Sequence, residues 1–282
     1  MERRKAIVIT GTSTGIGRAC ALHLDKLGFK VYAGVRNQID GQNLRKEASE
    51  NLTTINLDVT SAESIALAAG IIEKETSGEL FGLINNAGIG RGGVLEVTPI
   101  TEARALIEVN LIGLMAVTQA FIPMLRQAKG RIINIGSSSS FIAFPGASVY
   151  AASKFAVRAI TDSLRRELKP FGMSVILVAP GVVESKIWDK GKAYIEKLRR
   201  SVPADIALLY IPLSKFADKL DSEMKKIPAE EVAKAVAHSL TSKKPKSVYL
   251  VGSGAKRAVK LSHFPSDLLD WIIMKPIRKM GK

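Results

Sequence analysis

The segment AIVITGTSTGIG, residues 6–17, carries the strongest structural signal in this chain. A short apolar run with the pattern of a buried strand leads directly into a turn with glycines at 11, 15 and 17, and the helical pattern RACALHLDKLG follows from residue 18. Glycine lets a backbone turn tightly and approach a bound group closely, and a helix beginning there directs free N–H groups and its positive dipole end at that group. The G-x-x-x-G-x-G spacing in this position therefore predicts a site for the pyrophosphate of a dinucleotide.

The rest of the chain repeats the change from strand to helix. Six further runs have strand character, namely KVYAGV from 30, TTINL from 53, LFGLIN from 80, RIINIG from 131, SVILVA from 174 and SVYLV from 247. Strands that alternate with helical segments are typical of βαβ units. We therefore expect an α/β fold over residues 1–282: a single Rossmann-type domain with a doubly wound parallel sheet of about seven strands and helices on both faces.

Two segments depart from this rhythm. Strand and helix patterns lapse over about 184–226, after the carboxyl end of the sixth predicted strand, where open α/β sheets bind ligands. We interpret this stretch as a substrate lid inserted into the domain. The second segment is the basic C-terminal stretch, about 264–282.

The charge balance is strongly basic. The chain has a formal net charge of +15, and residues 243–282 hold ten Lys or Arg against Asp267 and Asp270. Basic residues are not interleaved with aromatic ones, so we expect no nucleic-acid partner. In FPSDLLDWIIMKPIRKMGK, residues 264–282, apolar side chains lie beside terminal cations, which fits either peripheral membrane contact or a helix packed on its own domain with a solvated basic end.

Cysteine and histidine usage excludes other classes. The single cysteine, Cys20, cannot form an internal disulfide, and the three histidines lack metal-ligand spacing, so we expect a cytoplasmic protein without a metal site. No run of 18 apolar residues occurs that would span a bilayer.

The end of the second strand distinguishes NADP(H) from NAD(H). An acidic residue there would bind the ribose 2′-hydroxyl, whereas an arginine would pair with a 2′-phosphate. Gly34 occupies the expected acid position and Arg36 follows it. We therefore expect NADP(H) rather than NAD(H), with Thr12, Ser13, Thr14 and Arg18 as further donors; the alternative is that Arg36 points to solvent.

A different class of enzyme shares one pattern with this turn. Gly11 to Gly15 also form a G-x-S-x-G sequence between strand and helix, which in α/β-hydrolases presents a serine nucleophile, here Ser13. That reading places the nucleophile after the first strand and leaves only His238 and His263 as bases. We favour the dinucleotide.

Tyr150 and Lys154 form the second strong signal. Four residues apart on a helix, they share one face and lie about 6 Å apart along its axis. A nearby ammonium, and the positive ring of an oxidised nicotinamide, would stabilise the tyrosine phenolate. Tyr150 would then act as general acid or base for an alcohol or a carbonyl.

With these elements the chain resembles the short-chain dehydrogenase/reductase family, and most closely its retinol and 17β-hydroxysteroid dehydrogenase branch. The matching motifs, in the family's order, are TGTSTGIG (10–17), LDVT (57–60), NNAG (85–88), Asn110, Ser137, YAASK (150–154) and PGVVES (180–185). The resemblance implies Asn110, Ser137, Tyr150 and Lys154 as the catalytic residues, with Ser138 as the alternative serine. It also implies that the cofactor is held by Gly11, Thr12, Ser13, Thr14, Gly15, Ile16, Gly17, Arg36, Asp58, Val59, Asn86, Ala87, Gly88, Tyr150, Lys154, Pro180, Gly181, Val183 and Ser185. Ser185 stands where threonine is commoner in the family, and Glu184 adds a charge.

The residues between the catalytic positions suggest the substrate. Phe141, Phe144 and Trp188, with Ser137 and Tyr150, would line an apolar pocket under the insertion, so we expect a bulky hydrophobic alcohol, ketone or aldehyde, steroid- or retinoid-like. The alternative is that these aromatics pack the insertion on the core or form a subunit interface. Helices at about 101–128 and 150–169 match those that pair subunits in the family and imply a homodimer or homotetramer. A cofactor-binding sensor on the same fold is the alternative function.

Overall fold

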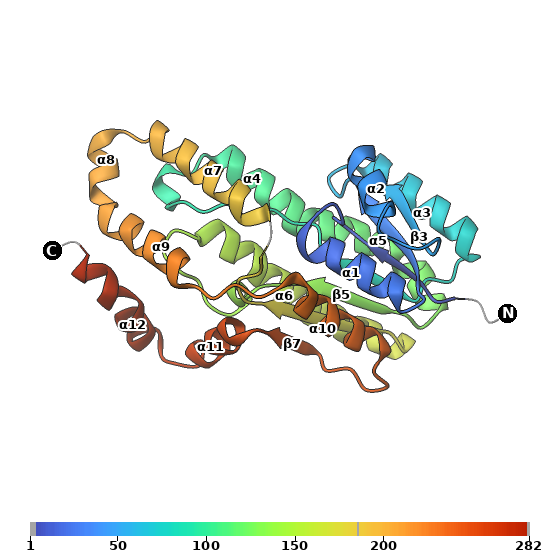
Figure 1. The fold of residues 1–282 in the computed structure, drawn as a ribbon. Coiled ribbons are helices and arrows are strands. Elements are labelled where there is room, and N and C mark those ends of the chain that lie inside the picture. Colours follow the sequence, from blue (N-terminus) through green and yellow to red (C-terminus); the bar gives the residue numbers. More distant parts are fainter. Residues whose placement is uncertain (1–3, 185, 281–282) are drawn as a thin grey trace.

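The computed structural model describes residues 4–184 and 186–280, in which seven strands form one parallel sheet (Figure 1). The strand order is β3-β2-β1-β4-β5-β6-β7. The chain adds β2 and β3 on one side of β1 and β4 to β7 on the other, so the order of the strands reverses between β1 and β4 while all strands stay parallel. The strands are β1 (Ala6–Ile9), β2 (Lys30–Val35), β3 (Leu52–Asn56), β4 (Gly82–Asn85), β5 (Arg131–Ile135), β6 (Ser174–Pro180) and β7 (Val248–Val251). Each lies within or overlaps a run predicted from the sequence, so the predicted doubly wound α/β sheet is confirmed.

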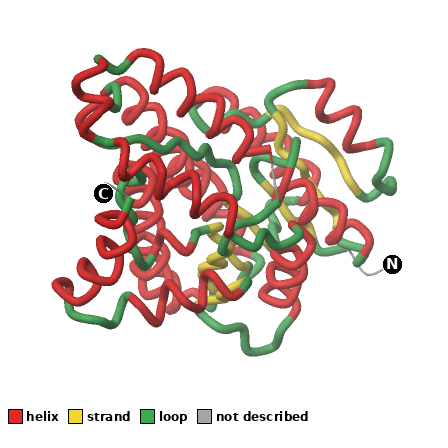
Figure 2. Tube along the Cα trace, turned by 60° about the vertical axis from the view of Figure 1, so that its left-hand side comes forward, coloured by secondary structure: helices red, strands yellow, loops and turns green. Residues whose placement is uncertain are grey.

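Helices lie on both sides of the central strands (Figure 2). They are α1 (Gly15–Lys26), α2 (Gln38–Arg45), α3 (Ala62–Thr76), α4 (Ile100–Ile107), α5 (Gly113–Gln127), α6 (Ser148–Leu168), α7 (Lys186–Ser201), α8 (Ala204–Leu209), α9 (Ile211–Glu223), α10 (Ala229–Thr241), α11 (Ser253–Leu261) and α12 (Ser266–Lys279). A π-helical turn, Glu108–Ile112, joins α4 to α5. In an open sheet of this kind, ligands bind beyond the carboxyl ends of the strands at the point of reversal, here β1 and β4.

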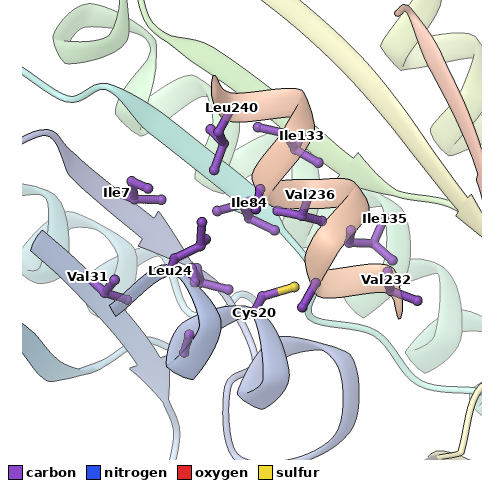
Figure 3. Close-up of a cluster of buried hydrophobic side chains, with 14 of the residues drawn as sticks. Ile7, Cys20, Leu24, Val31, Ile84, Ile133, Ile135, Val232, Val236 and Leu240 are labelled. Carbon is purple, nitrogen blue, oxygen red and sulfur yellow. The ribbon is translucent and has the colours of Figure 1, made fainter. Parts of the chain in front are cut away.

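One face of the sheet is covered by α1 and α10 (Figure 3). Cys20 and Leu24 of α1 and Val232 and Val236 of α10 pack on strand residues such as Ile84, and all five are inaccessible to solvent. Apolar residues on both faces of β1 explain why its sequence is continuously hydrophobic rather than alternating.

The opposite face is covered by α3 and α5, with Leu168 of α6. The helical stretch Ile100–Gln127 has a mean hydropathy of 1.8, and by length and composition it is the one described helix that could cross a membrane. Val117, Phe121 and Leu125 from this stretch are fully buried against the sheet. This packing accounts for much of its apolar character as a core helix.

The two irregular segments of the sequence are helical and lie together at one end of the molecule (Figure 1). The stretch at 184–226 holds α7, α8 and α9, and the C-terminal stretch holds α12. Ile273 and Ile277 of α12 are buried against Ile142 and Ala258, with Phe216 of α9 alongside. The C-terminal helix thus packs on its own domain, as one of the two sequence interpretations proposed.

Candidate active site

The turn after β1 has the backbone geometry that its glycines predicted. Gly11 and Gly15 have φ values of +69° and +58°, in the left-handed region that favours glycine. A Cβ atom on Gly17 would lie 2.3 Å from the carbonyl oxygen of Gly11, so only glycine fits there. Thr14, the N-cap residue of α1, makes no side-chain capping bond, and the first turn contains no acid. Uncapped N–H groups at this described helix start fit an anionic pyrophosphate.

The NNAG segment after β4 is locked to this turn. The hydroxyl of Thr10 accepts hydrogen bonds from the N–H groups of Asn86 (3.0 Å) and Ala87 (2.9 Å). The amide of Asn86 donates to the carbonyls of Thr10 and Gly11, both at 2.9 Å. A Cβ on Gly11 would approach Ala87 Cα to 2.8 Å. The carboxyl ends of β1 and β4 therefore form one rigid edge, in which Asn86 has a structural task and Gly88 lies beside Asn110.

The predicted 2′-phosphate donors differ in placement. Arg36 is exposed directly after β2, whereas Thr12 is fully buried and its hydroxyl donates to the Gly34 carbonyl at 3.0 Å. Arg18 forms a 2.5 Å ion pair with Glu47 and lowers the pKa of that carboxyl. Ser13, Thr14 and Ile16 are partly exposed on the turn. Of these side chains, Arg36 is the cation that stays open to solvent, and Thr12 faces the interior.

The remaining predicted cofactor positions lie at neighbouring strand ends. Asp58, after β3, accepts hydrogen bonds from the N–H and hydroxyl of Thr60 (2.9 and 2.8 Å). Val59 is buried, and its carbonyl would lie 2.7 Å from a Cβ on Gly113.

The segment after β6 turns back toward the sheet. Pro180 ends the strand and the N–H of Gly181 donates to Val251 at 2.9 Å. The Val183 side chain is buried in the core, which leaves its main chain at the sheet edge. Ser185 lies outside the described residues.

The predicted catalytic residues meet at the carboxyl end of β5. Ser137 caps the 3-10 turn Ser138–Ser140, and its hydroxyl accepts from the N–H of Ser139 at 3.1 Å. Lys154 on α6 is buried, and its Nζ donates to the Ile135 carbonyl at 3.0 Å and lies 6.0 Å from the centre of the Tyr150 ring. One strand end and one helix face thus bring together the serine, tyrosine and lysine predicted from the sequence.

Burial dominates the electrostatics of this group. It raises the pKa of Tyr150, against a smaller lowering by a hydrogen bond with Ser137. Burial also lowers the pKa of Lys154 from 10.5 to about 8. Desolvation therefore raises the pKa of Tyr150 in the protein alone, and the lowering by Lys154 that the spacing predicted is not the dominant effect.

Asn110 lies in the π-helical turn and is buried with all its polar groups bonded. Its Oδ1 accepts from the N–H of Ile89 at 2.8 Å, and its Nδ2 donates to the Ile89 carbonyl at 3.0 Å and to Ser153 Oγ at 3.1 Å. The predicted high cost of burying this amide without partners is thereby avoided.

Ser153 is a positioning residue that the sequence interpretation missed. It is fully buried between Tyr150 and Lys154, and its hydroxyl donates to the Tyr150 carbonyl at 2.7 Å while accepting from Asn110. A polar residue immediately before Lys154 in YAASK was the available signal.

The two described aromatic residues proposed for the substrate pocket, Phe141 and Phe144, lie in different clusters. Phe141 is buried in a cluster with Leu114 and Val157 and stacks under Arg158, 4.4 Å from the ring centre. Phe144 is partly buried in the cluster that contains Ile273 and Ile277. Trp188 falls within α7, but its side chain is outside the described part of the chain. Phe141 therefore packs as the alternative interpretation proposed, and Phe144 lies on the side of the insertion.

The insertion meets the loop after β4 through a charged contact. Arg91 forms an ion pair with Glu102, and its guanidinium lies 5.3 Å from the centre of the Tyr194 ring on α7. Ile195 and Leu198 of α7 lie close to Gly92 and Gly93, where a Cβ would come within 3.1 and 2.9 Å of their methyl groups. Arg91, Gly92, Gly93 and Tyr194 line a small pocket together with Val149, the residue next to Tyr150.

The histidines that a hydrolase would require have other partners. His238 Nδ1 lies 2.9 Å from the hydroxyl of Tyr249, and His263 Nδ1 lies 2.6 Å from the Val259 carbonyl. Ser13 therefore gains no support as a nucleophile.

A parallel sheet with a glycine turn at its point of reversal, and a serine, tyrosine and lysine at the next strand end, defines an oxidoreductase built to bind a dinucleotide. The chain belongs to the short-chain dehydrogenase family, because residues 5–194 match the sequence model described as short chain dehydrogenase.

Relatives lie in the predicted branch. Bovine (Bos taurus) 17-beta-hydroxysteroid dehydrogenase type 6 is 38% identical over 283 residues, which cover 96% of this chain and 88% of that protein. Mouse (Mus musculus) retinol dehydrogenase 7 is 32% identical over 295 residues, covering 98% and 91%. A solved short chain dehydrogenase from Burkholderia cenocepacia, in complex with NADP, has a TM-score of 0.74 and 26% identity and covers 96% of this chain and 98% of its own.

Proposed function

We propose that this protein is an NADP(H)-dependent oxidoreductase that transfers hydride between nicotinamide and a bulky hydrophobic alcohol, ketone or aldehyde of steroid- or retinoid-like shape. The observation that carries the proposal is the meeting of Ser137, Tyr150 and Lys154 at the end of β5, beside the uncapped glycine turn. The geometry of that turn fits the cofactor, since backbone N–H groups are free there and a Cβ at residues 11 or 17 would block it.

Each catalytic residue has a definite task in this reaction. When bound, the nicotinamide supplies the two-electron chemistry by accepting or giving the hydride. Ser137 holds the substrate oxygen, and Tyr150 donates its phenolic proton to that oxygen during reduction or removes the hydroxyl proton during oxidation. Lys154, fixed by the Ile135 carbonyl, places its ammonium beside the phenol and stabilises the phenolate that forms.

Support for NADP(H) comes from the end of β2. Arg36 is exposed and offers bidentate bonds to a phosphate, and residues 34–39 contain no acid that would repel one. The similar Burkholderia enzyme is in complex with NADP.

Support for a lipophilic substrate comes from the relatives' names and from local composition. The similar proteins include a hydroxysteroid and a retinol dehydrogenase. The loop between Ser137 and Tyr150 carries Ile142 and Phe144 into an apolar cluster with the insertion and α12. A hydrophobic substrate would find apolar walls on this side.

We also propose a homodimer or homotetramer. Ile112 and Phe155 are 43% and 40% exposed on the outer side of the α4–α5 stretch and of α6. Large apolar side chains in such positions are suited to a subunit contact.

The test is NADPH oxidation, with NADH in parallel, against steroid ketones, retinal and small aliphatic ketones. Turnover of a bulky carbonyl that falls roughly 100- to 10,000-fold in Tyr150→Phe, with NADPH binding unchanged, supports the proposal. The matched control is Tyr249→Phe, whose hydroxyl bonds to His238 away from the site. Tight NADPH binding without turnover of any carbonyl would instead favour a cofactor-binding sensor on this fold.

A further inference from the structure

Helix α12 exposes large apolar side chains on its outer face, where a surface helix usually carries polar ones. Its inner face is apolar, with Ile273 and Ile277 buried in the domain. Its outer face is also apolar in the first half, because Leu268 and Trp271 are 43% and 53% exposed and Phe264, just before the helix, is 46% exposed. Phe264 precedes the helix, whereas Leu268 and Trp271 are three positions apart within it, so these two side chains form a line on the side away from Ile273.

Cations continue the same line. Lys275 and Arg278 follow at the same helical spacing, Lys279 lies beside them, and all three are exposed. The Nζ of Lys275 lies 4.6 Å above the centre of the Trp271 ring. Of the helix's two acids, Asp267 lies four residues before Trp271, on the N-terminal part of the same face, and Asp270 lies to one side. The outer face of α12 thus has large apolar groups followed by cations.

We propose that this outer face docks on the surface of an anionic phospholipid bilayer. Phe264, Leu268 and Trp271 enter the layer between headgroups and acyl chains, where tryptophan is favoured, and Lys275, Arg278 and Lys279 pair with lipid phosphates. Both features are required for such binding, since exposed apolar area anchors the helix and cations attract the anionic surface.

A second copy of the chain fits this face less well than lipid does. The chain has a formal net charge of +15, so two copies that approach each other through this face repel each other electrostatically. An anionic bilayer is complementary to these cations, and it accepts three apolar side chains without the shape matching that a protein partner requires.

The position of α12 gives docking a consequence for the reaction. The inner face of the helix packs against Ile142 and Phe144, in the loop between Ser137 and Tyr150. Docking would therefore hold the substrate side of the domain next to the bilayer, where lipophilic substrates dissolve. This consequence, unlike the docking itself, rests on the proposed function.

Trp271 is a built-in probe. The chain has two tryptophans, so Trp188→Phe leaves Trp271 as the only one. We expect its fluorescence to shift to shorter wavelength with vesicles of phosphatidylcholine and phosphatidylglycerol, much less with phosphatidylcholine alone, and to return when salt is raised to about 1 M. No shift with the anionic vesicles would overturn the proposal.

Two sets of variants separate charge from apolar contact in vesicle flotation. The triple variant Lys275→Glu, Arg278→Glu and Lys279→Glu is expected to bind anionic vesicles at least about 100-fold more weakly. Its control, Lys243→Glu, Lys244→Glu and Lys246→Glu, changes the net charge equally on the turn before β7, at the other end of the molecule (Figure 1). Equal weakening of vesicle binding by both triple variants would show that net charge alone attracts the protein to the vesicles. That result would refute docking through the outer face of α12.

The apolar pair Leu268→Ala and Trp271→Ala is expected to weaken binding roughly tenfold or more. Its control replaces Ile39 and Leu67, which are 65% and 62% exposed on other helices, with alanine. If the pair instead changes the oligomeric state in lipid-free sedimentation, the face is a contact between copies and the proposal fails. Vesicle binding without turnover of any carbonyl would leave docking standing and refute only the proposed function.

Discussion

The side-chain amide of Asn110 donates a 3.1 Å hydrogen bond to the hydroxyl of Ser153, and this contact joins the π-helical turn to the catalytic helix. The Ser153 hydroxyl in turn donates a 2.7 Å hydrogen bond to the Tyr150 carbonyl. Asn110 also binds both main-chain groups of Ile89, at the loop after β4. One buried amide therefore sets the relative positions of the cofactor edge and the tyrosine.

Asn110→Leu should damage both stability and catalysis. The substitution keeps similar volume but leaves the N–H and carbonyl of Ile89 without their partner, so we expect the free energy of unfolding in urea to fall by about 1–3 kcal/mol. The kcat should fall by a larger factor than KM rises. The substitution removes the hydrogen bonds that position Tyr150 and Lys154, but it removes no contact with the substrate. Asn43→Leu, at an exposed position of α2, is the control. Wild-type kcat in Asn110→Leu would contradict the positioning role.

Lys154→Met should stabilise the fold at neutral pH while abolishing activity. Folding lowers the pKa of Lys154 from 10.5 to about 8, so between these values the folded state binds fewer protons and the free energy of unfolding rises with pH. The penalty for burying the charge is fully present below pH 8. Its removal should raise stability at pH 7 by up to about 3 kcal/mol, reduced by the lost bond to Ile135.

Unfolding of Lys154→Met and wild type at pH 7, 8, 9 and 10 measures this effect. The stability difference should shrink as pH rises, and Lys74→Met, at an exposed position of α3, should show no such trend. A pH-independent difference would mean that the lysine charge carries no burial penalty.

Gly17→Ala should weaken both the fold and cofactor binding. The new Cβ would lie 2.3 Å from the Gly11 carbonyl oxygen and 2.4 Å from Asn86 Nδ2, so the turn must move. We expect a loss of about 1–3 kcal/mol in stability and at least tenfold in NADPH affinity by fluorescence titration. Gly70→Ala in α3 has open space around it and should be neutral or stabilising by up to about 1 kcal/mol. Similar losses in the two variants would count against the close approach at Gly17.

Arg36→Asp should shift cofactor preference from NADPH to NADH. Loss of a charge-assisted bond to the 2′-phosphate, with a carboxylate in its place, is expected to lower NADPH affinity about 10- to 100-fold. Arg45→Asp makes the same charge change on α2 nearby and should leave the preference unaltered. Unchanged NADPH affinity in Arg36→Asp would remove the basis for assigning NADP(H).

Local patterns were sufficient to predict the strands and the proximity of Tyr150 to Lys154. The strands are continuous apolar runs, and Tyr150 and Lys154 are one helical turn apart, so neighbours in the sequence already define them. The directions of side chains on the glycine turn were not predictable from the sequence. Thr12 could point toward the cofactor or toward the Gly34 carbonyl, and the geometry of the folded sheet places its hydroxyl against that carbonyl.

Contacts between distant segments were also beyond the sequence. Phe141 lies between catalytic positions along the chain, but Leu114 and Val157 draw it into the core. Arg91 and Tyr194 are separated by about a hundred residues, and no local sequence pattern predicts the contact between them. Ser153 was hidden among the small residues of YAASK, since its role depends on Asn110 from another helix.

The apolar cluster that joins Ile142 and Phe144 to α12 also has a consequence for biosynthesis. Strands β1 to β6, together with Ser137, Tyr150 and Lys154, emerge from the ribosome before α12, so the first half of the sheet can begin to fold while translation continues. The loop beside Tyr150 gains its last neighbours only when the final helix has been made. A chain released early by premature termination would therefore have an intact glycine turn but an incomplete apolar cluster beside the Ser137–Tyr150 loop.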